Sequence, residues 1–251
     1  RIFSVYSGYV KDLAGNNSVS GNYNFTTSDV EEDITPPTIT QVNLPDGLVD
    51  VPVNPQFVMQ LSEAYSDICY TDHIVSFEKI SDGSLVTGEL SMTTDRKTLT
   101  FSLLSEVQLD GSTEYRVIVQ GICDFVGLPL DFTGATFTTA HTDERDTTSP
   151  AVEFATPWSG ATAVPLNTLI QVRYNERIDA TTIIGQTNLV LYENSTGIVP
   201  VDFEVLDDLR TVNIVPREAL KANQAYRIFS VYSGYVKDLA GNNSVSGNYN
   251  F

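Results

Sequence analysis

The sequence predicts an all-β protein made of tandem antiparallel β-sandwich domains, and three observations support this fold class. Thr, Val, Tyr, Phe, Gly, Asn and Asp are plentiful, while helix-forming stretches rich in Glu, Ala and Leu are scarce. Short runs of alternating apolar and polar residues recur roughly every ten residues, with turn residues between them. The chain also repeats itself, because residues 1–25 and 227–251 are identical.

The repeats predict how the chain is organised. One identical segment begins at Arg1 and the other at Arg227, and a looser similarity at half that spacing pairs Pro37 with Pro150 and Glu63 with Glu176. We call this shorter spacing the half-unit period. We therefore expect this sequence to be one part of a long tandem array of two-domain units. Its parts are the closing strands of a preceding domain (1–27), an acidic linker (28–35), a first domain (36–139), a second acidic linker (140–148) and a second domain (149–251).

The strands follow the same order in both halves. Residues 56–61 and 169–174 each place three apolar side chains on one face, Phe57, Met59 and Leu61 in the first half and Ile170, Val172 and Tyr174 in the second. Alternating runs at 98–103 and 211–216 follow, then runs that start at 115 and 226, and Phe-Thr-Thr ends the first half. About seven strands in a little over a hundred residues predict an immunoglobulin-type sandwich.

A tyrosine in each half supports this topology. Leu109 precedes Tyr115 by six residues, and Leu220 precedes Tyr226 by the same number. A tyrosine at the start of the penultimate strand is the position of a tyrosine corner. The helix-like stretch "PREALKANQAY" before Tyr226 is expected to be a brief turn.

These motifs carry a family resemblance. The order of "VPVNPQFVMQLSE", "TEYRVIVQG" and "FTT", and of "VPLNTLIQVRYNERID" and "VKDLAGN", resembles the bacterial Ig-like domain of large surface proteins and adhesins. The resemblance covers residues 35–251, with 1–27 as a partial copy. The first half departs from it by reading "CDFVGLP" where the other copies read "KDLAGN". The resemblance implies an extracellular spacer, stalk or fibre module at the cell surface, without activity of its own.

Charge and motif content exclude several function classes. The net charge is −18, with 32 acidic against 14 basic residues, which disfavours nucleic-acid and anionic-membrane partners. No apolar run reaches the length of a membrane span. The sequence has no phosphate-binding glycine loop, no H-E-x-x-H and no G-x-S-x-G. We therefore predict that the protein is not an enzyme.

The only two cysteines, Cys69 and Cys123, both lie in the first domain. In an immunoglobulin-type sandwich they fall in the loops between the second and third strands and between the last two strands, which share one end of the fold. We expect a disulfide that stabilises the domain by about 4 kcal/mol and indicates an oxidising location. A pair of free thiols is the alternative.

Acidic residues in the linkers and loops predict two cation sites. The first strand begins at the end of the sandwich that carries these loops, so two groups of carboxylates should converge there: Asp33, Glu63 and Asp124 in one, and Asp146, Glu176 and Asp238 in the other. Ca²⁺ prefers such hard oxygen ligands, and it would stiffen the joints between domains. The alternative is a pair of solvated acidic linkers that keep neighbouring domains apart.

The predicted partners are neighbouring identical repeats, either in the same chain or as subunits joined head to tail. The leading function is a non-catalytic structural repeat of a long extracellular stalk or filament. The alternative is a glycan- or protein-binding module that uses tyrosine-rich segments such as "SVYSGY" at residues 4–9 and "NYNF" at 248–251.

Overall fold

The structure is a computed structural model that describes residues 2–3, 10–19, 21–27, 32–66, 69, 74–184, 187–230 and 234–251. Backbone contacts divide the chain into two units, Arg1–Thr35 and Pro36–Phe251. In the described ranges every regular element is a β-strand except one 3-10 helix, η1 (Ala180–Thr182). None of these residues belongs to a helix long and apolar enough to cross a membrane. The predicted glycan-binding segment "SVYSGY" at residues 4–9 lies outside the described residues.

The first unit contains a small antiparallel pair of strands. β1 (Ile2–Phe3) pairs with β2 (Asn22–Tyr23). An isolated bridge between Lys11 and Asn17 closes a tight turn in the intervening segment.

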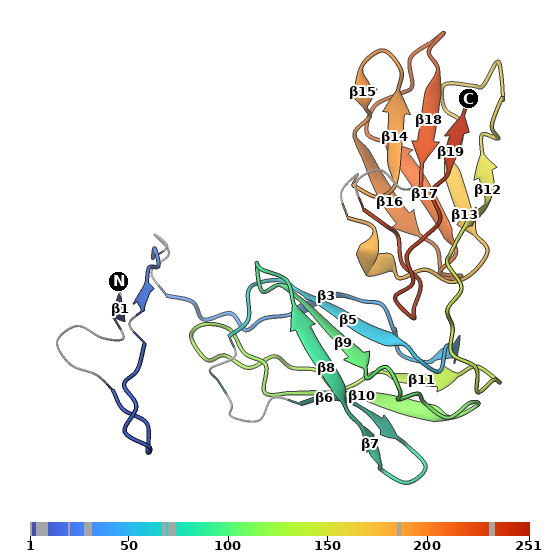
Figure 1. Cartoon of the computed structure of the whole chain (residues 1–251). Coiled ribbons are helices and arrows are strands. Elements are labelled where there is room, and N and C mark those ends of the chain that lie inside the picture. The colour runs from blue at the N-terminus through green and yellow to red at the C-terminus, as the bar shows by residue number, and fades with distance from the viewer. Residues whose placement is uncertain are drawn as a thin grey trace. The chain divides into compact units, whose positions relative to one another are not determined.

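The second unit contains two β-sandwiches, which we call domain 1 (residues 36–139) and domain 2 (residues 149–251). Domain 1 has a four-stranded sheet in the order β3-β5-β9-β8 and a five-stranded sheet in the order β4-β11-β10-β6-β7 (Figure 1). The strands of the first sheet are β3 (Ile39–Val42), β5 (Gln56–Leu61), β9 (Thr98–Leu103) and β8 (Gly88–Met92). Those of the second are β4 (Leu48–Val51), β11 (Thr136–Thr139), β10 (Glu114–Gln120), β6 (Ile74–Lys79) and β7 (Leu85–Val86).

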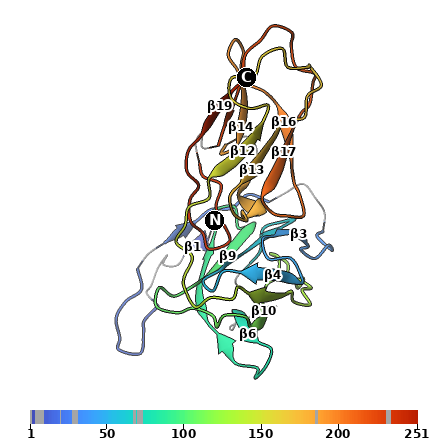
Figure 2. The same ribbon diagram turned by 90° about the vertical axis from the view of Figure 1, so that its right-hand side faces the viewer.

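Domain 2 repeats this plan with two four-stranded sheets, which Figure 2 shows from a second direction. One sheet has the order β12-β13-β17-β16, and the other has the order β15-β14-β18-β19. The strands are β12 (Val152–Thr156), β13 (Gln171–Tyr174), β14 (Val190–Glu193), β15 (Gly197–Ile198), β16 (Val201–Val205), β17 (Thr211–Pro216), β18 (Tyr226–Phe229) and β19 (Asn248–Asn250). The pairing of β11 with β4 in domain 1 is parallel, whereas the pairs of strands in domain 2 are antiparallel.

The cores confirm the predicted alternation. The predicted inward-facing residues Phe57, Met59 and Leu61 of domain 1, and Ile170, Val172 and Tyr174 of domain 2, are all at most 4% exposed. Burying such side chains supplies most of the free energy that holds a sandwich together. The all-β sandwich fold predicted from the sequence is therefore confirmed.

The tyrosine corners are present in both domains. The Tyr115 hydroxyl accepts a hydrogen bond from the Asp110 amide at 3.0 Å, and the Tyr226 hydroxyl accepts one from the Lys221 amide at 2.8 Å. Each buried ring therefore keeps its one polar atom satisfied while it anchors the turn that precedes it. The stretch before Tyr226 is a turn, as predicted.

Candidate functional site

The linker between domains 1 and 2 is held by side chains from both domains. Asn54 of domain 1 donates to the Asp146 carbonyl at 3.0 Å and accepts from the Asp146 amide at 2.8 Å. Asn242 of domain 2 also donates to the Asp146 carbonyl, at 3.3 Å. The backbone of Asp146 is therefore fixed from two sides, which limits bending at this point of the chain.

A turn of domain 2, residues 238–242 (the DLAGN turn), docks on domain 1. The Asp238 carboxylate accepts hydrogen bonds from the amides of Ala240 at 2.9 Å and Asn242 at 2.8 Å, and Gly241 supplies the positive φ of 89° that the turn needs. This conformation places Leu239, only 2% exposed, in the hydrophobic core cluster of domain 1. We call this contact, with the clamped linker, the joint.

A backbone hydrogen bond holds the DLAGN turn against domain 1. The Gln56 amide of domain 1 donates to the Leu239 carbonyl at 2.8 Å. A Cβ added to Gly241 would lie 2.5 Å from the Gln56 side chain, so glycine also permits the close approach of the two domains.

The 3-10 helix η1 and the residues before it add polar contacts to the joint. Asn43 donates to the Asp179 carboxylate at 3.3 Å, and Gln60 donates to the Thr181 carbonyl at 3.0 Å. The Arg177 guanidinium donates to the backbone carbonyls of Val49 and Asp50 in domain 1. These hydrogen bonds add direction to the apolar contact that Leu239 makes, so the joint resists rotation.

The structure brings together the second predicted group of carboxylates at this joint. Oxygens of Asp146, Glu176 and Asp238 all lie within 4.8 Å of one another. Asp146 and Glu176 also line a cavity of about 320 Å³, together with Arg177 and Arg210. One carboxylate comes from the linker and two from domain 2, so a cation bound there would tie the linker to the domain that follows it.

The negative charges of this group are only partly balanced, because burial and mutual repulsion outweigh the opposing effect of Arg210 on Glu176. Burial, with added repulsion from Asp146 and Asp238, raises the pKa of Glu176 to about 7. Burial also raises the pKa of Asp238, with a smaller contribution from the charge of Asp146. Among the described residues, the buried Oε1 atom of Glu176 has no hydrogen-bond partner. Each of these penalties would be relieved by a hard cation.

The first predicted group is divided between the two units of the chain. Glu63 and Asp124 belong to the second unit, and their carboxylate oxygens lie within 4.8 Å of each other. Asp124 is 1% exposed, and its Oδ2 atom has no hydrogen-bond partner in the described part of the chain. Asp33 belongs to the first unit and accepts from the Thr35 amide at 3.1 Å, so its role in this group stays a prediction.

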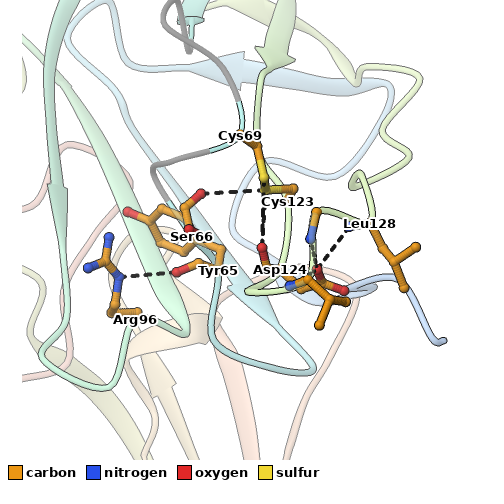
Figure 3. The surroundings of a disulfide bond; sticks show 9 residues. Tyr65, Ser66, Cys69, Arg96, Cys123, Asp124 and Leu128 are labelled. Atoms are coloured by element: carbon orange, nitrogen blue, oxygen red, sulfur yellow. Dashed lines mark hydrogen bonds between the residues drawn. A yellow bond between two sulfur atoms is a disulfide. The ribbon is translucent and has the colours of Figure 1, made fainter. Parts of the chain in front are cut away.

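The two cysteines are joined by a disulfide in domain 1, as predicted (Figure 3). Cys69 lies in the connection between β5 and β6, Cys123 in the connection between β10 and β11, and their Cα atoms are 6.1 Å apart. Asp124, next to Cys123, accepts hydrogen bonds from the amides of Val126, Gly127 and Leu128. The disulfide therefore fixes the start of the turn that begins at Asp124, which corresponds to the DLAGN turn of domain 2.

Sequence reasoning missed several residues of the joint. Asn54 and Asn167 repeat at the half-unit period, which marked the position without revealing its contact. Leu239 is an apolar residue in the middle of a polar turn, a signal that a surface loop is covered by something. Nothing in the sequence pattern indicated the part played by Arg177, because it acts on backbone carbonyls.

Comparisons with known proteins show what the chain is similar to. The family model of the bacterial Ig-like domain matches residues 33–139 and again residues 146–251. A search of curated proteins finds no match. Solved structures that resemble the chain include the N-terminal part of the bacterial S-layer protein SbsC (14% identity, TM-score 0.32) and a longer piece of the same protein (12%, 0.32), each matched over 86% of this chain. The titin Ig tandem A164-A165 is also similar (9% identity, TM-score 0.23), with 86% of this chain and 94% of that chain covered. The chain spans 43% and 25% of the two S-layer chains.

Proposed function

Because the chain belongs to the bacterial Ig-like domain family, we propose that it is a non-catalytic structural repeat of a long extracellular stalk or surface filament. The observation that carries this proposal is the joint between domains 1 and 2. A short linker clamped on both sides, with Leu239 buried in the neighbouring core, transmits force and orientation from one sandwich to the next. The identity of residues 1–25 with 227–251 supports repetition of the same unit along a parent chain.

Calcium is the cation that we propose for the joint. Asp146, Glu176 and Asp238 offer only hard oxygen atoms, which Ca²⁺ accepts in flexible sets of six to eight. The buried Oε1 atom of Glu176 points to a missing positive partner. The charge of the chain, −18, would also make neutralisation favourable. When bound, the cation would cross-link the linker to domain 2, and the residues that hold it would be these three.

Calorimetric titration of the EDTA-treated chain with calcium tests the cation. We expect heat of binding and a higher melting temperature for domain 2, because a ligand that binds only the folded state stabilises it. Glu176→Gln should abolish both effects. The matched control is Glu153→Gln, which removes one exposed carboxylate from β12 in the same domain. No heat, or an equal loss in both variants, would contradict the calcium site.

Small-angle X-ray scattering tests the stalk itself. We expect the pair of domains 1 and 2 to scatter as one extended rigid body, with a maximum dimension that grows linearly when repeats are added in phase. Leu239→Asp should convert the rigid pair into a flexible one, since it puts a charge where the joint buries a leucine. A flexible wild-type pair would contradict the proposal whether or not calcium binds.

A further inference from the structure

The loop 161–170 of domain 2 exposes apolar side chains that need an explanation. Leu166 is 48% exposed and Leu169 is 56% exposed. The same loop borders a cavity of about 530 Å³ whose lining includes Ala163, Leu166, Tyr226 and Phe251. Two exposed leucines in a loop that borders a hollow of mixed apolar and polar lining indicate a docking surface.

The corresponding loop of domain 1 is identified by its backbone as well as by its sequence. Asp50 and Ala163, which are separated by the half-unit period, both have positive φ, of 58° and 56°. Gly47 and Gly160 repeat at the same period with φ of 77° and 89°. At this period Val53, Asn54 and Gln56 of domain 1 are therefore the counterparts of Leu166, Asn167 and Leu169 of domain 2.

In domain 1 this loop is the surface on which the next domain docks. The Gln56 amide bonds to the Leu239 carbonyl, Asn54 clamps the linker at Asp146, and Val53 is fully buried. The counterparts in domain 2 are all exposed, and Gln56 is replaced there by a leucine. The loop of domain 2 therefore corresponds to the docking loop of domain 1, but its exposed side chains are more apolar.

A complementary turn exists at residues 124–128 of domain 1. It has the conformation of the DLAGN turn, because Asp124 accepts three backbone amides at 2.7–2.9 Å and Gly127 has a φ of 95°. Where the DLAGN turn carries Leu239, this turn carries Phe125, which is 67% exposed, and beside it Val126 is 58% exposed. The apolar residue that would dock in such a joint, Phe125, is therefore exposed to solvent.

The order of segments in the chain makes these two surfaces neighbours. Residues 1–25 are identical to residues 227–251, which close domain 2, and they precede the linker that leads into domain 1. In the proposed array, a sandwich of the domain 2 type therefore comes directly before each domain 1. In that linker Asp33 is the counterpart of Asp146, so its backbone has the position in the sequence that the Asn167 side chain of the preceding sandwich would clamp.

We propose that Leu166, Asn167 and Leu169 of domain 2 form the docking surface for the Phe125 turn of domain 1 in a second copy of this chain. This inference rests on the proposed function, because it specifies the second of two alternating joints in the array. Phe125 takes the position of Leu239, Asn167 clamps the linker at Asp33, and the Leu169 amide donates to the Phe125 carbonyl as the Gln56 amide donates to that of Leu239. On the docking surface Leu169 stands where domain 1 has Gln56, and in the turn Phe125 stands where domain 2 has Leu239. Both sides of this second joint therefore carry larger apolar surfaces than the joint between domains 1 and 2.

The test uses two repeats in phase, residues 1–251 followed directly by residues 26–251 of a second copy. Hydrogen exchange read by mass spectrometry on peptides that contain Leu169 samples both repeats equally. We expect two equal populations, the first repeat exchanging about tenfold or more slowly because its amide is bonded across the joint. The single chain extended only by residues 26–35 should show the fast population alone.

Position-specific variants decide whether the slow population reports docking. Phe125→Asp in the second repeat should remove it, whereas Phe125→Asp in the first repeat, where the turn faces no docking surface of domain 2, should leave it unchanged. A single fast population in the two-repeat protein, or a slow one that survives Phe125→Asp in the second repeat, would overturn the inference. If the Leu169 amide is not protected but the Gln56 amide is, the second joint is refuted while the proposed array still stands. If neither the Gln56 amide nor the Leu169 amide is protected, the array is refuted as well.

Discussion

Residues 10–19 and 236–245 share one sequence and form the same turn in two different environments. Asp12 accepts hydrogen bonds from the amides of Ala14 and Asn16, both at 2.9 Å, as Asp238 does from the amides of Ala240 and Asn242. The bridges of the two copies also match, Lys11 with Asn17 and Lys237 with Asn243. The difference is burial, since Leu13 is fully exposed and Leu239 is 2% exposed.

The comparison separates what the local sequence determines from what the neighbouring domain adds. The aspartate-capped turn needs only its own residues, because its hydrogen bonds span two to four positions. Burial of the leucine needs domain 1 as a receptor. Paired substitutions at equivalent positions can therefore measure the contribution of the joint directly.

The largest effect is expected from truncating the two leucines. Leu239→Ala should lower the free energy of unfolding by about 2–4 kcal/mol, because it removes a buried side chain and leaves a cavity. Leu13→Ala should change it by less than about 0.5 kcal/mol, because surface truncations away from special features are nearly neutral. Urea unfolding of both variants makes the comparison. Equal losses would mean that Leu239 does not act through the joint.

The glycines of the two turns should differ by a smaller amount. Gly15 and Gly241 have φ of 83° and 89°, so an alanine at either position is strained by about 1 kcal/mol. Only at Gly241 would the new Cβ also meet a neighbour, the Gln56 side chain. We expect Gly241→Ala to cost about 1 kcal/mol more than Gly15→Ala, because the joint must open slightly. Thermal unfolding of the two variants gives the difference, and no difference would mean that Gln56 moves aside freely.

These contrasts also define how far the sequence could predict the molecule. Period-2 alternation located strands such as 56–61 because burial on one face imposes that pattern on any sandwich. The spacing of Leu220 and Tyr226 identified a corner because it depends on a local hydrogen bond. The convergence of Asp146, Glu176 and Asp238 was predictable from loop positions in a known topology.

The contacts that build the joint could not be predicted in the same way. The residues in contact, such as Asn54 and Asp146 or Gln56 and Leu239, lie far apart in the sequence. A single sequence contains no signal for such pairs, because each residue looks like an ordinary loop residue until the second domain is placed. The internal repeat is the exception, because equivalent positions in the two halves let the joint seen between domains 1 and 2 predict the contacts of a second joint.

A pH-dependent effect should appear where the DLAGN turn meets Glu176. The folded-state pKa of Glu176 is raised from 4.5 to about 7, so in calcium-free buffer the wild-type chain loses stability as the pH rises through this interval. Glu176→Gln should therefore be neutral near pH 4 and more stable than wild type by about 1 kcal/mol at pH 8, a figure reduced for partial solvent exposure. Chemical unfolding at a series of pH values measures the gain, with Glu153→Gln as the exposed control. A gain that does not depend on pH would contradict the assignment.

The smallest effect is a pair of opposite titration shifts in identical sequences. Hydrogen bonds from Asn16 lower the pKa of Asp12, whereas burial raises the pKa of Asp238 despite the same bonds from Asn242. Carbon-detected NMR of the side-chain carboxyls in EDTA should therefore place Asp12 below 3.8 and Asp238 above it, with Asp12→Asn and Asp238→Asn to assign the signals. Leu239→Asp, which opens the joint, should move the pKa of Asp238 toward that of Asp12. Two coincident titrations in the wild-type chain would show that desolvation at the joint is too weak to distinguish the copies.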